Sequence, residues 1–141
     1  MTAAARSVRR VWASVLMGLA MGWAAPAVAA DALAAHDYLL NCAGCHTPAG
    51  TGSRTVPTLH GVDRLLAHRD GRAYVLHVPG VASAPLSDAR LAALLDWVFT
   101  HFGNDAQTHF TVAEVAAARV APFADPKAAR AALESTAQAA L

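Results

Sequence analysis

The sequence predicts a small all-α protein. Its clearest segment, 85–102, places apolar residues at helical spacing between Leu91 and Val98, after Ser87 as a helix-capping residue. Residues 103–141 carry two further helical patterns, whereas almost no stretch alternates apolar and polar residues as a half-buried strand does. The length of 141 residues suits one compact domain.

Residues 1–30 have the pattern of an export signal. Three arginines give the segment a positive start, an uncharged apolar run follows over 11–25, and small residues stand before Asp31. We expect cleavage here and a periplasmic chain of bacterial type. The alternative is an uncleaved segment that anchors the chain in the membrane and leaves the remainder facing the periplasm, because about 20 apolar residues can span a bilayer.

Removal of this segment changes the charge of the chain. It takes three of the 11 Lys and Arg residues and leaves all 10 Asp and Glu, so the net charge changes from +1 to about −2. No basic nucleic-acid-binding surface is expected from such a composition. The same segment holds every methionine of the chain: Met1, Met17 and Met21.

Residues 40–50 read LNCAGCHTPAG and contain the only two cysteines of the chain, Cys42 and Cys45, with His46 directly after them. A disulfide or a dithiol is one interpretation for an exported chain. Thioredoxin-like proteins that use Cys-x-x-Cys, however, alternate strands with helices. A zinc site is a second interpretation, which would need two more ligands from among the histidines.

The order Cys-x-x-Cys-His is typical of a third chemistry, the covalent attachment of haem. In that arrangement the two thiols add across the haem vinyl groups, and the following histidine coordinates the iron. We therefore expect one haem c, with Cys42 and Cys45 as thioether anchors and His46 as an axial iron ligand.

Around this motif the sequence resembles the class I c-type cytochromes. Members of that family carry a small residue and an aromatic residue on the helix before the motif, matched here by Ala34 and Tyr38. They carry a leucine and an aromatic residue on the last helix of the domain, matched by Leu94 and Trp97. The resemblance implies that the two helices cross with these pairs in contact.

The segment TVPTLHGV resembles the family's Pro-x-Leu-x-Gly stretch. The resemblance implies that the Pro57 carbonyl accepts a hydrogen bond from the His46 ring and that Leu59 packs on the haem. It also implies a small cytochrome c fold around one haem over residues 31–102, with residues 103–141 as a helical C-terminal extension.

The family's usual sixth ligand, a methionine ahead of the last helix, has no counterpart in residues 31–141. His77 lies closest in sequence to the expected place, and imidazole is a good iron ligand, so His77 is the tentative sixth ligand. The main alternative is an open or water-bound position; His60 and the remaining histidines fit less well. Pro79, Gly80 and Pro85 are expected to limit how the loop over 78–85 folds.

The extension is expected to contain two helices. Thr111 and Glu114 have capping-box spacing, and a second helix begins at Pro126. Apolar side chains such as Phe123 are expected to cover the domain rather than bind a partner. The arginines between Arg54 and Arg72 are interpreted as scattered solvated charge, with a partner surface or the haem propionates as alternatives.

We expect from these features an exported monohaem cytochrome that transfers single electrons between redox partners, such as a dehydrogenase, an oxidase or another cytochrome. It would be an electron carrier or the haem subunit of an oxidoreductase rather than an enzyme by itself, with no nucleic-acid partner and no membrane contact after signal cleavage. The alternative is a haem-based small-molecule sensor or a peroxidase-like protein with an open sixth position. The small apolar residues over 78–85 argue against peroxide chemistry.

Overall fold

The computed structural model describes residues 25–104 and 107–138. All regular structure in these ranges is helical, which confirms the all-α prediction. The chain divides into two compact units, 1–32 and 33–141. Because the described residues begin at residue 25, most of the predicted export signal lies outside them. None of the described helices has the length and hydrophobicity needed to cross a bilayer.

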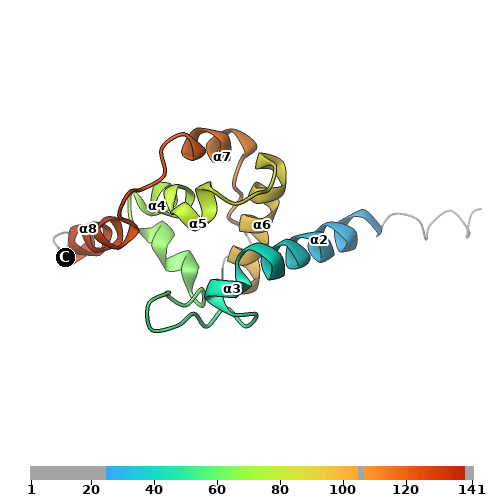
Figure 1. Ribbon diagram of the computed structural model, residues 1–141, viewed down its shortest axis with the longest axis horizontal. Helices are drawn as coiled ribbons and strands as arrows, with labels where there is room; N and C mark the ends of the chain where they lie inside the picture. Colours follow the sequence, from blue (N-terminus) through green and yellow to red (C-terminus); the bar gives the residue numbers. More distant parts are fainter. Residues whose placement is uncertain (1–24, 105–106, 139–141) are drawn as a thin grey trace, which may run out of the picture. The chain divides into compact units, whose positions relative to one another are not determined.

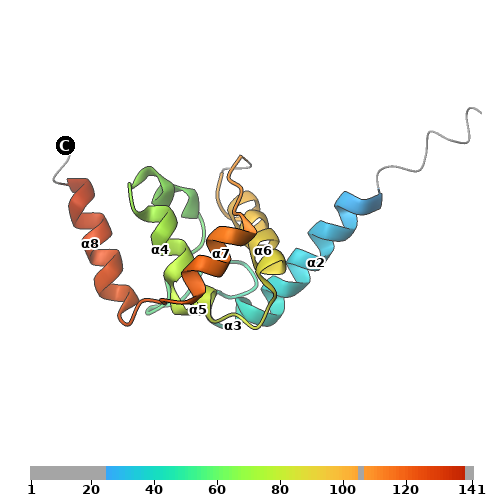
Figure 2. The same cartoon turned by 90° about the horizontal axis from the view of Figure 1, so that it is seen from above.

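The described residues form eight helices (Figure 1). In chain order these are α2 (Ala25–Asn41), α3 (Ala43–His46), the 3₁₀ helix η1 (Val62–Ala67), α4 (Gly71–His77), α5 (Pro79–Ala82), α6 (Asp88–His101), α7 (Val112–Arg119) and α8 (Pro126–Gln138). Figure 2 shows α7 between α4 and α6, and α7 contacts both helices. The helix α8 contacts α4.

The helix α6 begins where the sequence predicts. The Ser87 hydroxyl accepts a hydrogen bond from the Arg90 backbone N–H (3.3 Å), and Asp88 lies in the first turn, where its charge complements the helix dipole. The predicted apolar face is confirmed as the buried face of the helix, which consists of Leu91, Ala92, Leu94, Leu95, Val98 and Phe99. Packing of this face is the main source of the stability of such a helix.

Aromatic packing and an ion pair join α2 to α6. The Tyr38 side chain is 1% exposed, and its ring centroid lies 5.5 Å from that of Trp97 and 5.0 Å from that of Phe102. This contact confirms the predicted pairing of Tyr38 with Trp97. Next to it, the buried Asp37 carboxylate accepts hydrogen bonds at both oxygens from the Arg90 guanidinium.

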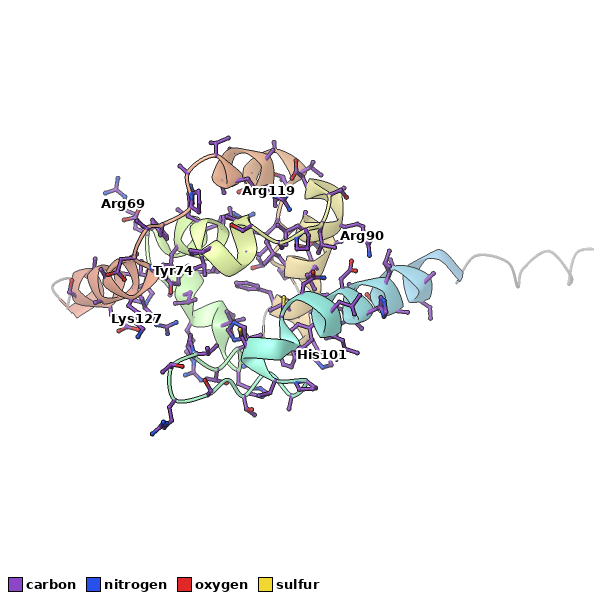
Figure 3. All side chains as sticks on the ribbon, in the orientation of Figure 1. Arg69, Tyr74, Arg90, His101, Arg119 and Lys127 are labelled. Carbon is purple, nitrogen blue, oxygen red and sulfur yellow. The ribbon has the colours of Figure 1, made fainter. Side chains whose placement is uncertain are left out.

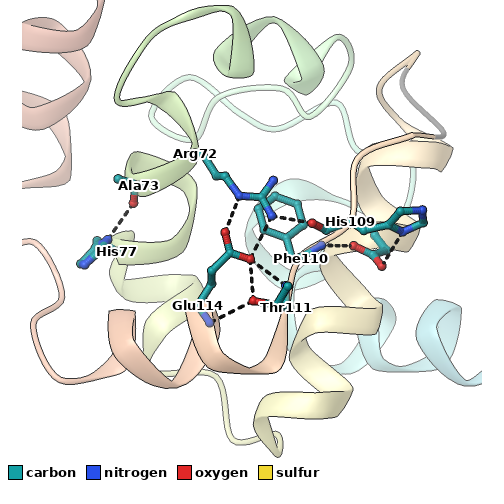
Figure 4. Close-up of polar contacts among 8 residues, drawn as sticks. Arg72, Ala73, His77, His109, Phe110, Thr111 and Glu114 are labelled. Carbon is teal, nitrogen blue, oxygen red and sulfur yellow. Dashed lines mark hydrogen bonds and ion pairs between the residues drawn. The ribbon is translucent and has the colours of Figure 1, made fainter.

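The C-terminal extension belongs to the same compact unit as the helices before it. The predicted capping box of Thr111 and Glu114 is present at the start of α7. Glu114 also accepts two hydrogen bonds from the Arg72 guanidinium of α4, at 2.6 and 3.0 Å (Figure 4). The same guanidinium lies 4.4 Å from the centre of the Phe110 ring. One arginine of α4 therefore ties α7 to the preceding domain through charge and ring contacts.

The last helix also begins as predicted. The Asp125 carboxylate accepts hydrogen bonds from the backbone N–H groups of Lys127 and Ala128, at 2.9 and 3.0 Å, and Pro126 is the first helical residue. Leu133 is buried in the core. Its burial anchors one face of α8 to the domain.

The ion pair of Arg72 and Glu114 predicts an acid-sensitive part of the stability. The hydrogen bonds from Arg72 lower the pKa of Glu114 from 4.5 to about 2. A carboxylate whose pKa is lowered in the folded state stabilises the fold above its unfolded pKa, and this contribution is lost as the pH falls through the folded pKa. Between about pH 4.5 and pH 2, Glu114→Gln is therefore expected to lose less stability than the parent chain.

Urea unfolding at a series of pH values measures this difference, with Glu134→Gln as the control because Glu134 pairs with Arg130 of the same helix. At neutral pH the Glu114→Gln variant should unfold at lower urea than either the parent or the control. Parallel acid profiles of the parent chain and Glu114→Gln would contradict this role of the ion pair.

Candidate functional site

The two cysteines and His46 lie on one helical turn. The backbone N–H groups of Cys45 and His46 both donate to the Cys42 carbonyl, at 3.1 and 2.9 Å. Both thiols are free; Cys42 is half-buried and Cys45 is exposed. Burial raises the pKa of the Cys42 thiol, and the charges of Cys45 and Asp37 raise it further. The Cys42 side chain is therefore protonated at neutral pH.

The described residues contain no group of three or more His, Cys, Asp or Glu side chains placed to hold a metal ion. A structural zinc site normally takes four protein ligands. The additional ligands that the zinc interpretation requires are thus not found near Cys42 and Cys45 in this part of the chain.

The His46 ring is held by the residue that the sequence predicts. Its Nδ1 lies 3.0 Å from the Pro57 carbonyl oxygen. Because a carbonyl can only accept, Nδ1 carries the proton and donates, which leaves Nε2 as the unprotonated nitrogen. Burial lowers the pKa of His46, and the bond to Pro57 offsets part of that effect. The ring is therefore a neutral imidazole with one free lone pair, the form that binds metals.

The loop that carries Pro57 folds back onto α3. The backbone N–H of Gly52 donates to the His46 carbonyl (2.9 Å), and that of Ser53 donates to the Val56 carbonyl (2.8 Å). Gly52 has φ +70°, and a Cβ there would come within 2.4 Å of the Val56 oxygen and 2.6 Å of the Pro57 oxygen. Only glycine suits this position, so Gly52 helps to set the acceptor that orients the His46 ring.

A cavity of about 320 Å³ lies beside this ring. His46, Pro57 and Leu59 line it, and further apolar lining comes from Tyr74 and Val75 of α4, from Val81 of α5 and from Val78 between these two helices. Arg130 and Glu134 of α8 also line it. This volume and largely apolar lining are typical of cofactor and ligand sites.

His77 does not line this cavity. Its Nδ1 lies 2.8 Å from the Ala73 carbonyl oxygen (Figure 4), and its ring centroid lies 5.5 Å from that of Phe123. The structure therefore does not bring His77 together with His46. Two other histidines do line the cavity: His60, whose Nε2 lies 2.9 Å from the Ala49 carbonyl oxygen, and the half-buried His68.

The segment between α4 and α6 differs from the predicted loop. It contains the short helix α5, which begins at Pro79, and it supplies Val78 and Val81 to the cavity. Proline at the first helical position favours such a turn because its φ is already helical. The positions of Val78 and Val81 in the cavity wall thus depend on a helix that the sequence pattern did not indicate: Val81 lies in α5 and Val78 directly precedes it.

The C-terminal extension holds this segment at both ends. The Phe123 backbone N–H donates to the His77 carbonyl (2.9 Å). At the other end, the Arg119 side chain (labelled in Figure 3) donates to the carbonyls of Ala84 and Leu86, at 3.1 and 2.8 Å. Arg119 Nε also lies 3.1 Å from Asp88 Oδ1, close enough for charge attraction but not aligned for a hydrogen bond. These contacts hold in place the segment that contains α5 and forms one wall of the cavity.

Substitution of Arg119 is expected to loosen that wall. Arg119→Gln removes two charge-assisted hydrogen bonds and leaves the carbonyls of Ala84 and Leu86 without these donors, so the free energy of unfolding should fall by roughly 1–3 kcal/mol. Urea unfolding of the full chain measures the change, and Arg69→Gln is the control because Arg69 is exposed. Equal unfolding midpoints for the two variants would mean that Arg119 does not hold the segment.

Known proteins offer no further guide to the site. Comparisons of this chain with protein-family models, with curated protein sequences and with solved structures return no match. The assignment of a function therefore depends on the residues and contacts of the chain itself.

Proposed function

We propose that this chain is a monohaem c-type cytochrome with a small cytochrome c fold, which transfers single electrons between redox partners. One observation carries the proposal: two free thiols stand on the same helical turn as a neutral histidine, and that histidine lines a largely apolar cavity. A disulfide would account for the two thiols but not for the orientation of the His46 ring. Haem attachment uses all three side chains.

The donor set suits a haem. Cys42 and Cys45 would hold it through thioether bonds, formed when each thiol adds across a vinyl group, and His46 would bind the iron through Nε2. When bound, the haem supplies a one-electron couple between Fe(III) and Fe(II). The Pro57 carbonyl keeps the His46 ring in one tautomer and increases its basicity as a ligand.

The surroundings of His46 would tune this couple. Leu59, Tyr74 and Val75 line the cavity and make its wall largely apolar. In such an environment a net charge on the site is less well solvated, so the burial of the site affects the reduction potential. A protein of this kind would exchange electrons with a dehydrogenase, an oxidase or another cytochrome. We also propose that the chain is exported to the periplasm.

A second candidate function follows from the place of His77. This ring packs against Phe123 and does not line the cavity, which favours the alternative in which His77 is not the sixth iron ligand. The apolar Val78 and Val81 do line the cavity and provide no ligand atom. An open sixth position would allow a small neutral molecule, such as carbon monoxide, to bind, as in a haem-based sensor.

Redox titration and carbon monoxide binding test the two functions. Electron transfer predicts a reversible one-electron couple in the purified full-length protein, and the absence of such a couple would contradict it. Replacement of His77 by Ala is expected to leave the oxidised spectrum unchanged, because the His77 ring lies outside the cavity lining. His68→Ala is the matched variant for comparison: it also replaces a histidine by alanine, but at a residue that lines the cavity. Ready binding of carbon monoxide to the reduced protein would favour the sensor, and no binding would favour the electron carrier.

A further inference from the structure

A second cavity, of about 330 Å³, lies between the loop of residues 53–57 and the helix α8. Three cationic side chains line it: Arg54 from the loop, and Lys127 and Arg130 from α8. Residues 31–141 contain eight Lys and Arg residues in all. Three of the eight therefore face one small cavity, in a segment of the chain whose net charge is negative.

Much of this positive charge is not balanced within the described residues. Arg72, Arg90 and Arg119 each form an ion pair elsewhere in the domain. Arg54 and Lys127 are exposed and form no ion pair with another described residue, whereas Arg130 pairs with Glu134 one helical turn later, at 2.8 Å. Since Glu134 also lines the cavity and is its one acidic lining residue, the lining carries a net charge of about +2.

The cavity offers hydrogen-bond donors in addition to charge. The Ser53 hydroxyl oxygen accepts hydrogen bonds from the backbone N–H groups of Thr55 and Val56, at 3.4 and 3.2 Å. Its own O–H therefore remains as a donor, since a hydroxyl can donate once while it accepts. A guanidinium such as that of Arg54 can bind both oxygens of a carboxylate, and an ammonium such as that of Lys127 adds a mobile point charge.

This cavity adjoins the one that His46 lines. Pro57, Arg130 and Glu134 contribute to the lining of both. The Arg130–Glu134 pair therefore stands between the two spaces, and it also holds the Arg130 guanidinium in place. A molecule in the first cavity with acidic groups on one edge would present them to the second cavity.

We propose that the cavity between residues 53–57 and α8 is a carboxylate-binding site in which Arg54, Lys127 and Arg130 bind two carboxylates. The proposal rests on the proposed function, because haem has two carboxylate side chains on one edge. The same chemistry would also accept a free dicarboxylate. By either route, the C-terminal extension completes the binding site with two of its three cations.

Two measurements on the purified full-length protein distinguish the two possible sources of the carboxylates, the haem and a free dicarboxylate. The first is the midpoint potential of Arg54→Gln, with Lys127→Gln as a second variant; both side chains are exposed, so neither change should disturb folding. The matched control is Arg69→Gln, which removes the same charge from an exposed residue that lines neither cavity (Figure 3). The second measurement is the binding of succinate by calorimetry.

If haem carboxylates occupy the site, Arg54→Gln and Lys127→Gln lower the potential more than Arg69→Gln does, because loss of a nearby positive charge disfavours the reduced iron. If a free dicarboxylate occupies it, succinate binds the parent protein and binds Arg54→Gln at least tenfold more weakly. The absence of both effects would overturn the proposal. Haem attachment is read separately from the visible spectrum, and a haem-free chain that still binds succinate would leave the site standing while the proposed function fails.

Discussion

The hydrogen bond between the His46 ring and the Pro57 carbonyl is the contact on which the candidate site depends. It joins the helical turn that carries both thiols to the loop that closes one side of the cavity, and it selects the tautomer with a free Nε2. The acceptor is held in turn by a loop that turns at Gly52, where a side chain would collide with the Pro57 oxygen. Backbone conformation therefore sets the chemistry of the histidine.

The C-terminal extension serves the same site from the other side. Phe123 and Arg119 hold the two ends of the segment that carries α5, and Arg130 and Glu134 line the cavity from α8. These contacts make the extension part of the site rather than an added tail. They also account for the place of His77, whose ring packs on Phe123 beside the backbone bond that this residue donates.

The sequence could predict whatever depends on local pattern. The capping residues Ser87 and Thr111 and the buried face of α6 follow from spacing and were found as predicted. The contact of Tyr38 with Trp97 was expected from the resemblance to class I c-type cytochromes and is also present. Contacts between distant residues could not be predicted in this way. The prediction that Arg72 is solvated charge is wrong, because its partner Glu114 lies 42 residues away. The lining by His68 and Arg130 likewise depends on how η1 and α8 pack, which periodicity does not report.

We propose that Cys42 and Cys45 carry a haem whose iron His46 binds. Intact-mass spectrometry under denaturing conditions tests this most directly, on the full-length protein purified from cells that mature c-type cytochromes. We predict a polypeptide mass increased by one haem, and the mass of the polypeptide alone for a Cys42→Ala, Cys45→Ala double variant. A parent chain without added haem mass from the same cells would contradict the account and return the two cysteines to thiol or disulfide chemistry.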